Sequence, residues 1–297
     1  MIHYEFLRLT ALFILDLVDS FARQRGLSGN HPRPFGPVRV LLTARTPVGG
    51  TREVLTPPWE LIMVRNESGF DLFFGDFKAA GGVRRWPLPD GKYELRVEST
   101  YYQAAVLPVD VSRSAPAPNP QPTQLAPGFA YPFPTGTTLL RGSAQLPDGS
   151  GEPGVRILTS ASGVVPYVTD AAGQWVLVLP VLAQATQVVV AYRRPNKPDQ
   201  RAAITVTPGA TASLPATALE GQVFDGPRGA GGATIRVRVS PIAVPAQTDG
   251  RWRYVFAIDQ PAAVTDVTAA LPDGRQQTVS DVAITPKQTT AVAPFRF

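Results

Sequence analysis

The sequence contains no cysteine and only two histidines among its 297 residues. The missing cysteines exclude disulfide bonds, thiolate metal sites and cysteine nucleophiles. The histidines are His3, near the N-terminus, and His31, in a short segment rich in proline and glycine. We expect both to be exposed or locally bonded, and neither to serve as a catalytic base or as half of a metal-binding pair.

Charge is also scarce. Charged residues make up 17% of the chain, and the net charge of +5 is spread without any block of one sign. We therefore expect no nucleic-acid partner. No run of about 20 apolar residues free of charge is present, so we expect no transmembrane segment. Proline (31) and glycine (26) are frequent, which favours short strands and turns over helices.

One helix is expected, over residues 2–25. On a helical wheel its charged side chains share a narrow strip, which includes Glu5, Asp16 and Asp19. Apolar side chains cover the rest, and we take the following as candidate partner-docking residues: Phe6, Leu9, Phe13, Leu17 and Phe21. A large apolar surface normally marks an interface. The alternatives are packing on the chain's own first domain and binding at a membrane surface.

The same segment does not have the pattern of a cleavable signal peptide. Glu5 precedes the first arginine, and Asp16 and Asp19 interrupt the apolar run. We therefore expect synthesis in the cytoplasm without a cleaved leader, and membership of a released or membrane-associated particle as one destination.

Alternation of apolar and polar residues predicts a first β-sandwich over 37–113, after a helix and linker over 1–36. In Gly91–Val97, for example, Tyr93, Leu95 and Val97 alternate with charged residues. The domain is rich in aromatic residues, which we expect to form its core, with a sugar-binding face as the alternative: Trp59, Phe70, Phe73, Phe74, Phe77 and Trp86.

Residues 114–138 contain seven prolines and no charge, which predicts an extended, semi-rigid linker. Beyond it, residues 139–215 and 216–297 align with each other at an offset of about 79. The clearest match is Thr169-Asp170…Gly173-Gln174-Trp175 with Thr248-Asp249-Gly250-Arg251-Trp252, and four further blocks match in the same order. We therefore predict two repeated antiparallel sandwiches.

The matched pattern is an apolar-x-Gly strand, Asp-Gly or Gly-Pro turns, and Thr-Asp-x-x-Gly-x-aromatic before a strand that ends in proline. It resembles the carboxypeptidase regulatory-like (transthyretin-like) domain of bacterial multidomain proteins. The resemblance implies an all-β chain of three small Ig-like or transthyretin-like sandwiches in tandem, with the helix at the N-terminus. It also implies structural, spacer or binding modules without catalytic residues.

The residues themselves indicate no reaction chemistry. The repeats have no histidine to activate a nucleophile. Their carboxylates, such as Asp170 and Asp249, lie in turns, where aspartate caps its own backbone. The glycine-rich run 226–232 lacks the Lys-Ser/Thr of a phosphate-binding loop. We therefore predict no enzyme activity, no catalytic, cofactor-binding or metal-binding residues, and no cofactor.

Two pairs of arginines suggest a basic patch. Arg236 and Arg238 share one face of a predicted strand, as do Arg251 and Arg253 on another. If the two strands were neighbours, the four arginines would form one patch suited to an acidic protein partner. A solvated sheet face is the alternative.

Two functions remain open from the sequence. The first is a non-catalytic structural or adaptor subunit of a large assembly, such as a contractile injection system or phage-tail-like particle, docked through its N-terminal helix. Its partners would be other protein subunits, including copies of itself. The alternative is a multidomain adhesion or glycan-binding protein of a cell or particle surface.

Overall fold

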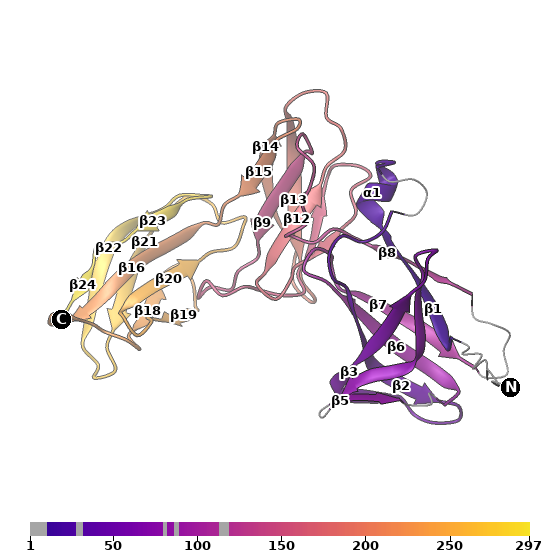
Figure 1. Ribbon diagram of the computed structural model, residues 1–297. Helices are drawn as coiled ribbons and strands as arrows, with labels where there is room; N and C mark the ends of the chain where they lie inside the picture. The colour runs from indigo at the N-terminus through magenta and orange to yellow at the C-terminus, as the bar shows by residue number, and fades with distance from the viewer. Residues whose placement is uncertain (1–10, 28–31, 80–81, 86–88, 113–118) are drawn as a thin grey trace, which may run out of the picture. The chain divides into compact units, whose positions relative to one another are not determined.

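The computed structural model describes residues 11–27, 32–79, 82–85, 89–112 and 119–297. It divides into an N-terminal unit, residues 1–132, and a C-terminal unit, residues 133–297. Both are built almost entirely of β-strands (Figure 1). The prediction of an all-β chain is confirmed.

The N-terminal unit is built on one eight-stranded sheet in the order β7-β6-β2-β3-β4-β1-β8, with β5 paired to β4. Its strands are β1 (Phe13–Asp19), β2 (Arg39–Pro47), β3 (Glu53–Arg65), β4 (Asp71–Ala79), β5 (Gly82–Arg85), β6 (Gly91–Glu98), β7 (Ala105–Val111) and β8 (Gln121–Leu125). The segment after β8 bonds to the β6–β7 connection, through Gln103 N to Ala126 O (2.9 Å) and Gly128 N to Tyr101 O (2.7 Å). These two bonds tie the end of β8 to the connection at the other end of the sheet order.

The predicted N-terminal helix is wrong. Residues Phe13–Asp19 form strand β1, which pairs with β4 and β8, and within the described part of this segment only Ser20–Gln24 is helical (α1). Phe13, Leu15 and Leu17, at every second position, are buried in the core. The apolar residues of the segment therefore fit the two-residue period of a strand as well as the period of a helix. Pairing on both edges within a sheet outweighs the modest helix preference of leucine. Residues 1–10 lie outside the described part of the chain.

The segment expected to be a linker also contributes to this sheet. Strand β8 lies within 114–138 and pairs in parallel with β1 over five residues. Thr123 and Leu125 are buried, while Pro122 takes a place in an outer strand. Proline is tolerated there because an outer strand has one edge that needs no partner.

The C-terminal unit contains two sandwiches, here called the second domain (139–215) and the third domain (216–297). The second has sheets β12-β9-β15 and β11-β10-β13-β14. Its strands are β9 (Leu139–Ser143), β10 (Arg156–Thr159), β11 (Tyr167–Val168), β12 (Gln174–Val178), β13 (Thr186–Arg193), β14 (Gln200–Val206) and β15 (Thr211–Leu214).

The third domain repeats this plan. Sheet β17-β16-β20, extended by β23 and β24 on β16, faces sheet β19-β18-β21-β22. The strands are β16 (Ala218–Asp225), β17 (Arg228–Gly229), β18 (Thr234–Val237), β19 (Ala243–Pro245), β20 (Arg251–Val255), β21 (Ala263–Ala270), β22 (Gln276–Ile284), β23 (Thr289–Ala291) and β24 (Phe295–Arg296).

The two repeated tryptophans are core residues of these sandwiches. Trp175 lies opposite Gly142, and Trp252 lies opposite Gly221. Both tryptophans are buried. A Cβ atom at Gly142 would lie 2.4 Å from the Trp175 ring, and one at Gly221 would lie 2.9 Å from the Trp252 ring. The glycine of each apolar-x-Gly strand therefore makes room for the aromatic ring across the sheet.

Candidate functional site

The predicted docking surface at the N-terminus is absent from the described residues. Phe13, Leu17 and Phe21 are 1%, 4% and 5% exposed, buried within their own unit. Phe6 and Leu9 lie outside the described residues. Because the three described side chains already form core, they are not free to bind another subunit.

The four arginines do not form one patch. Arg236 lies on β18, and Arg251 and Arg253 lie on β20, which belongs to the opposite sheet of the sandwich. The condition that the two strands be neighbours therefore fails. Acidic side chains also lie beside three of the arginines: Asp266 near Arg238 (3.4 Å), Asp249 near Arg251 (3.5 Å) and Glu220 near Arg253 (3.7 Å).

A buried carboxylate, which the sequence did not single out, organises the N-terminal unit. Asp19 is 2% exposed and caps α1 by accepting from Ala22 N (2.9 Å). Its other oxygen accepts from the hydroxyls of Tyr102 and Tyr131, each at 2.7 Å. Burial, followed by the Asp19 carboxylate, raises the pKa of both phenols. The cluster ties three distant segments of the chain together, which is a structural role.

In the C-terminal unit, a threonine anchors the start of each domain. Thr217 stands immediately before β16 and is buried. Its hydroxyl accepts from Lys287 N (2.7 Å), and its carbonyl accepts from Phe256 N (2.9 Å). One residue thus joins the β22–β23 turn to the end of β20.

The second domain has the same arrangement. Thr138 stands before β9, its hydroxyl accepts from Gly209 N (2.8 Å), and its carbonyl accepts from Leu179 N (3.0 Å). We call each set a threonine clasp. Because each clasp satisfies buried polar groups with good geometry, it fixes the direction in which the chain enters its domain.

The two clasps differ at the residue whose backbone N–H donates to the threonine hydroxyl. Gly209 and Lys287 both have positive φ, 69° and 60°, a conformation that glycine adopts without strain and lysine does not. Lys287 nevertheless donates its ammonium group to the carbonyl of Ala203, on β14 of the second domain. Its side chain therefore bridges the two domains. A backbone bond, Val255 N to Pro147 O (2.7 Å), joins them at a second point.

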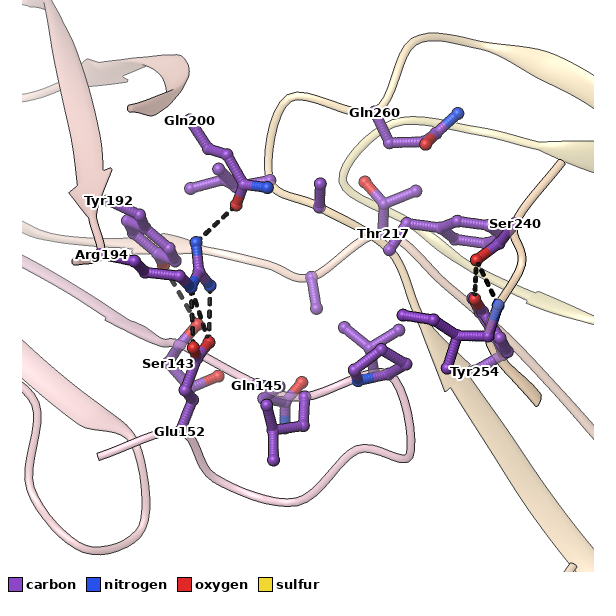
Figure 2. Close-up of a pocket in the computed structure, with 18 of the residues that line it drawn as sticks. Ser143, Gln145, Glu152, Tyr192, Arg194, Gln200, Thr217, Ser240, Tyr254 and Gln260 are labelled. Carbon is purple, nitrogen blue, oxygen red and sulfur yellow. Dashed lines mark hydrogen bonds and ion pairs between the residues drawn. The ribbon is translucent and has the colours of Figure 1, made fainter. Parts of the chain in front are cut away.

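A cavity of about 310 Å³ lies at this junction (Figure 2). The second domain supplies a charged wall in which the Arg194 guanidinium donates to both oxygens of Glu152, at 2.6–2.9 Å. Another guanidinium nitrogen donates to Gln200 Oε1 (2.7 Å). The two charges therefore neutralise each other at the wall.

Tyr192 lies beneath this ion pair. Its hydroxyl donates to Ser143 O and accepts from Trp175 Nε1, both at 3.0 Å. Burial raises the pKa of Tyr192, although the Trp175 hydrogen bond and the Arg194 charge act in the opposite direction. The phenol is therefore a fixed, neutral member of the wall.

The third domain supplies the opposite wall. There Tyr254 donates its hydroxyl to Ser240, and Figure 2 shows this pair across the cavity from Arg194. The rim carries three large apolar side chains that are 41–47% exposed: Leu146, Val239 and Ile242. The site thus combines internally paired polar groups with an apolar rim.

The charged wall is specific to the second domain. The backbone hydrogen bonds of Ala230 and Leu271 in the third domain match those of Glu152 and Arg194 in the second. The two pairs of residues therefore occupy equivalent positions. Comparison of the two repeats could have found this difference from sequence, since a charged pair replaces an apolar pair. Sequence reasoning missed it by treating every carboxylate in a turn alike.

Comparisons with known proteins assign no family. No family model and no curated protein matches the chain, so the resemblance to carboxypeptidase regulatory-like domains stays a prediction. Among solved structures, a streptococcal ancillary pilin is 12% identical, with a TM-score of 0.23 and coverage of 96% of this chain and 99% of that chain.

The major pilin subunit of Bacillus cereus is 8% identical, with a TM-score of 0.20 and coverage of 96% and 98%. A Ca²⁺-stabilised adhesin with which an Antarctic bacterium binds ice is 10% identical, with a TM-score of 0.16 and coverage of 85% and 65%.

Across the described residues, no helix is long and apolar enough to cross a membrane. No group of three or more histidine, aspartate or glutamate side chains there is placed to hold a metal ion.

Proposed function

We propose that the chain is a non-catalytic structural and adhesion protein in which the second and third domains act as one stiff spacer. The observation that carries this proposal is the bridged junction. Thr217 fixes the start of the third domain, and Lys287 extends from the same clasp to Ala203 of the second domain. A freely jointed pair of domains would not need the contact between Lys287 and Ala203.

The energetics of Lys287 support this role. A residue other than glycine with φ near +60° costs on the order of 1 kcal/mol. The matched position in the second domain is Gly209, which avoids that cost. The third domain therefore bears local strain at the residue whose side chain crosses the junction, as expected if the junction matters for function.

The proposal places the protein at a cell or particle surface, in contact with other protein subunits or with a glycan. The proposal does not include docking through an N-terminal helix in a contractile injection system, because residues Phe13–Asp19 of that predicted helix form core strand β1. What supports the adhesion role is the junction cavity, whose rim exposes apolar side chains.

Cross-linking of intact native cells, followed by fractionation and purification of the protein, tests the proposal. We expect the chain in a surface or particle fraction, linked to other proteins of an assembly. Recovery as an unlinked cytosolic monomer would contradict it, as would a catalytic activity lost on substitution of a single carboxylate.

A further inference from the structure

Three glutamine side chains line the junction cavity, and each uses only half of its amide within the protein. Gln200 and Gln145 come from the second domain and Gln260 from the third. Among the described residues, each amide has one hydrogen-bond partner: Arg194 for Gln200, Gly149 O for Gln145 and Pro261 O for Gln260.

The chemistry of these partners fixes which half of each amide is free. Arg194 can only donate, so Gln200 must turn its oxygen toward the guanidinium and keep its nitrogen free. Figure 2 shows this nitrogen on the side away from Arg194. The carbonyls of Gly149 and Pro261 can only accept, so Gln145 and Gln260 turn their nitrogens to them and keep their oxygens free.

The cavity therefore offers one amide nitrogen and two amide oxygens without a partner among the described residues, and these amide groups carry no net charge. Glu152 and Arg194 neutralise each other, and Lys197, which also lines the cavity, has an exposed, solvated side chain. Leu146, Val239 and Ile242 supply an apolar rim beside these amides. A ligand that fits must both donate and accept, remain neutral, and present C–H surface along with its polar groups.

We propose that this cavity binds a neutral saccharide. Hydroxyl groups both donate and accept, and the C–H faces of a sugar ring match the apolar rim. The volume of about 310 Å³ lies at the lower end of the range for small-molecule sites, about 300–1,000 Å³. The ligand is therefore a mono- or disaccharide, or the end of a longer chain.

This inference rests on the proposed adhesion role and adds its ligand. Because both domains line the cavity, the stiff junction that makes the C-terminal unit a spacer also holds the two walls of the site in register. The two claims remain separable, since the junction can be stiff without binding a sugar.

The test uses the full chain and four neutral probes: maltose, lactose, cellobiose and N,N′-diacetylchitobiose. Saturation-transfer NMR and titration calorimetry measure binding. We expect at least one probe to bind saturably. The variant Gln200→Glu keeps an acceptor for Arg194 but replaces the free donor, and we expect it to weaken binding about tenfold or more, as loss of one well-made hydrogen bond does.

Two further variants make the result specific. Gln184→Glu makes the same change of charge at an exposed glutamine of the second domain and should bind like the unmodified chain. Gln260→Met removes an acceptor from the opposite wall and should weaken binding.

The proposal is overturned if none of the four probes binds the unmodified chain. It is also overturned if Gln200→Glu binds as well as Gln184→Glu, or if glucuronate binds more tightly than every neutral probe. Failure in any of these ways leaves the surface location and the stiff junction to be judged by their own experiments.

Discussion

Replacement of Lys287 by glycine separates the strain of one residue from the stiffness of the junction. The variant takes the residue found at the matched position, Gly209. It relieves the positive-φ strain of Lys287 (φ 60°), which is on the order of 1 kcal/mol. It also removes the ammonium bond to Ala203 O. A hydrogen bond to a charged group contributes about 1.5–3 kcal/mol when buried, and less here because Lys287 is partly exposed.

The two effects fall on different equilibria. Relief of strain acts on the fold of the third domain, so we expect its unfolding free energy to stay the same or to rise slightly. The lost bond acts on the contact between domains, which we expect to weaken by about 1–1.5 kcal/mol.

The amide of Val255 reports that contact, because it bonds to Pro147 O across the junction. Hydrogen exchange followed by NMR measures it directly. In Lys287→Gly, exchange at Val255 should be about tenfold faster, since 1.4 kcal/mol corresponds to a factor of ten. Protection within β21 and β22 should be unchanged.

Asp281→Gly is the matched control. Asp281 also has positive φ, 58°, and lies in the same domain, on strand β22. This variant should relieve similar strain without changing exchange at Val255. Equal acceleration in both variants, or none in Lys287→Gly, would refute the assignment of Lys287 as the bridge.

Three further predictions concern buried polar groups. Asp19→Asn turns an amide N–H₂ toward either Ala22 N or the two tyrosines. It should therefore lower the unfolding free energy of the N-terminal unit, measured in urea, by about 2–3 kcal/mol. A decrease below about 0.5 kcal/mol would contradict the role of the cluster. The raised pKa of Tyr102 and Tyr131 keeps both phenols neutral in the folded state, whereas tyrosines of the unfolded chain ionise near pH 10. The unfolding free energy of the N-terminal unit should therefore be constant below that pH and fall above it. A urea midpoint for this unit that does not change from about pH 9 to 11 would contradict this prediction. Glu152→Ala should destabilise the second domain by about 2 kcal/mol, because it leaves the partly buried Arg194 charge without its partner. Adding Arg194→Leu should restore most of the loss, because apolar residues can replace a desolvated ion pair. No recovery in the double variant would show that the pair itself is needed.

The repeated core was predictable because its signals are local. The turn before Trp175 needs glycine at a positive φ, and Gly173 (φ 72°) provides it. The Asp170 carboxylate caps the same turn by accepting from Ala172 N (2.9 Å). Sequence spacing alone reveals such a device, and its second copy at Trp252 confirms the repeat.

The N-terminal strand was not predictable in the same way. Phe13, Leu15 and Leu17 match a strand, but the neighbouring apolar residues also complete a helical face. The decision depends on pairing with β4 and with β8, and β8 lies about 100 residues later in a proline-rich segment. A contact of that sequence separation leaves no local signal.

The candidate site was missed for a related reason. Its walls come from two domains, and its free amide groups belong to glutamines whose sequence context is ordinary. Lys287, which bridges the same junction, also differs from its repeat partner, because the second domain has glycine, Gly209, at the matched position. An alignment of the two repeats at their Thr-Pro segments is enough to reveal that difference.

The stiffness of the C-terminal unit is tested most directly by a distance measured between its two domains. The chain has no cysteine, so Val181→Cys and Arg228→Cys, both at exposed positions, allow spin labels to be attached to the full chain without background. Pulsed electron-electron double resonance should give one narrow distance distribution, which broadens when Lys287→Gly is added. A broad distribution in the chain that retains Lys287 would contradict the account.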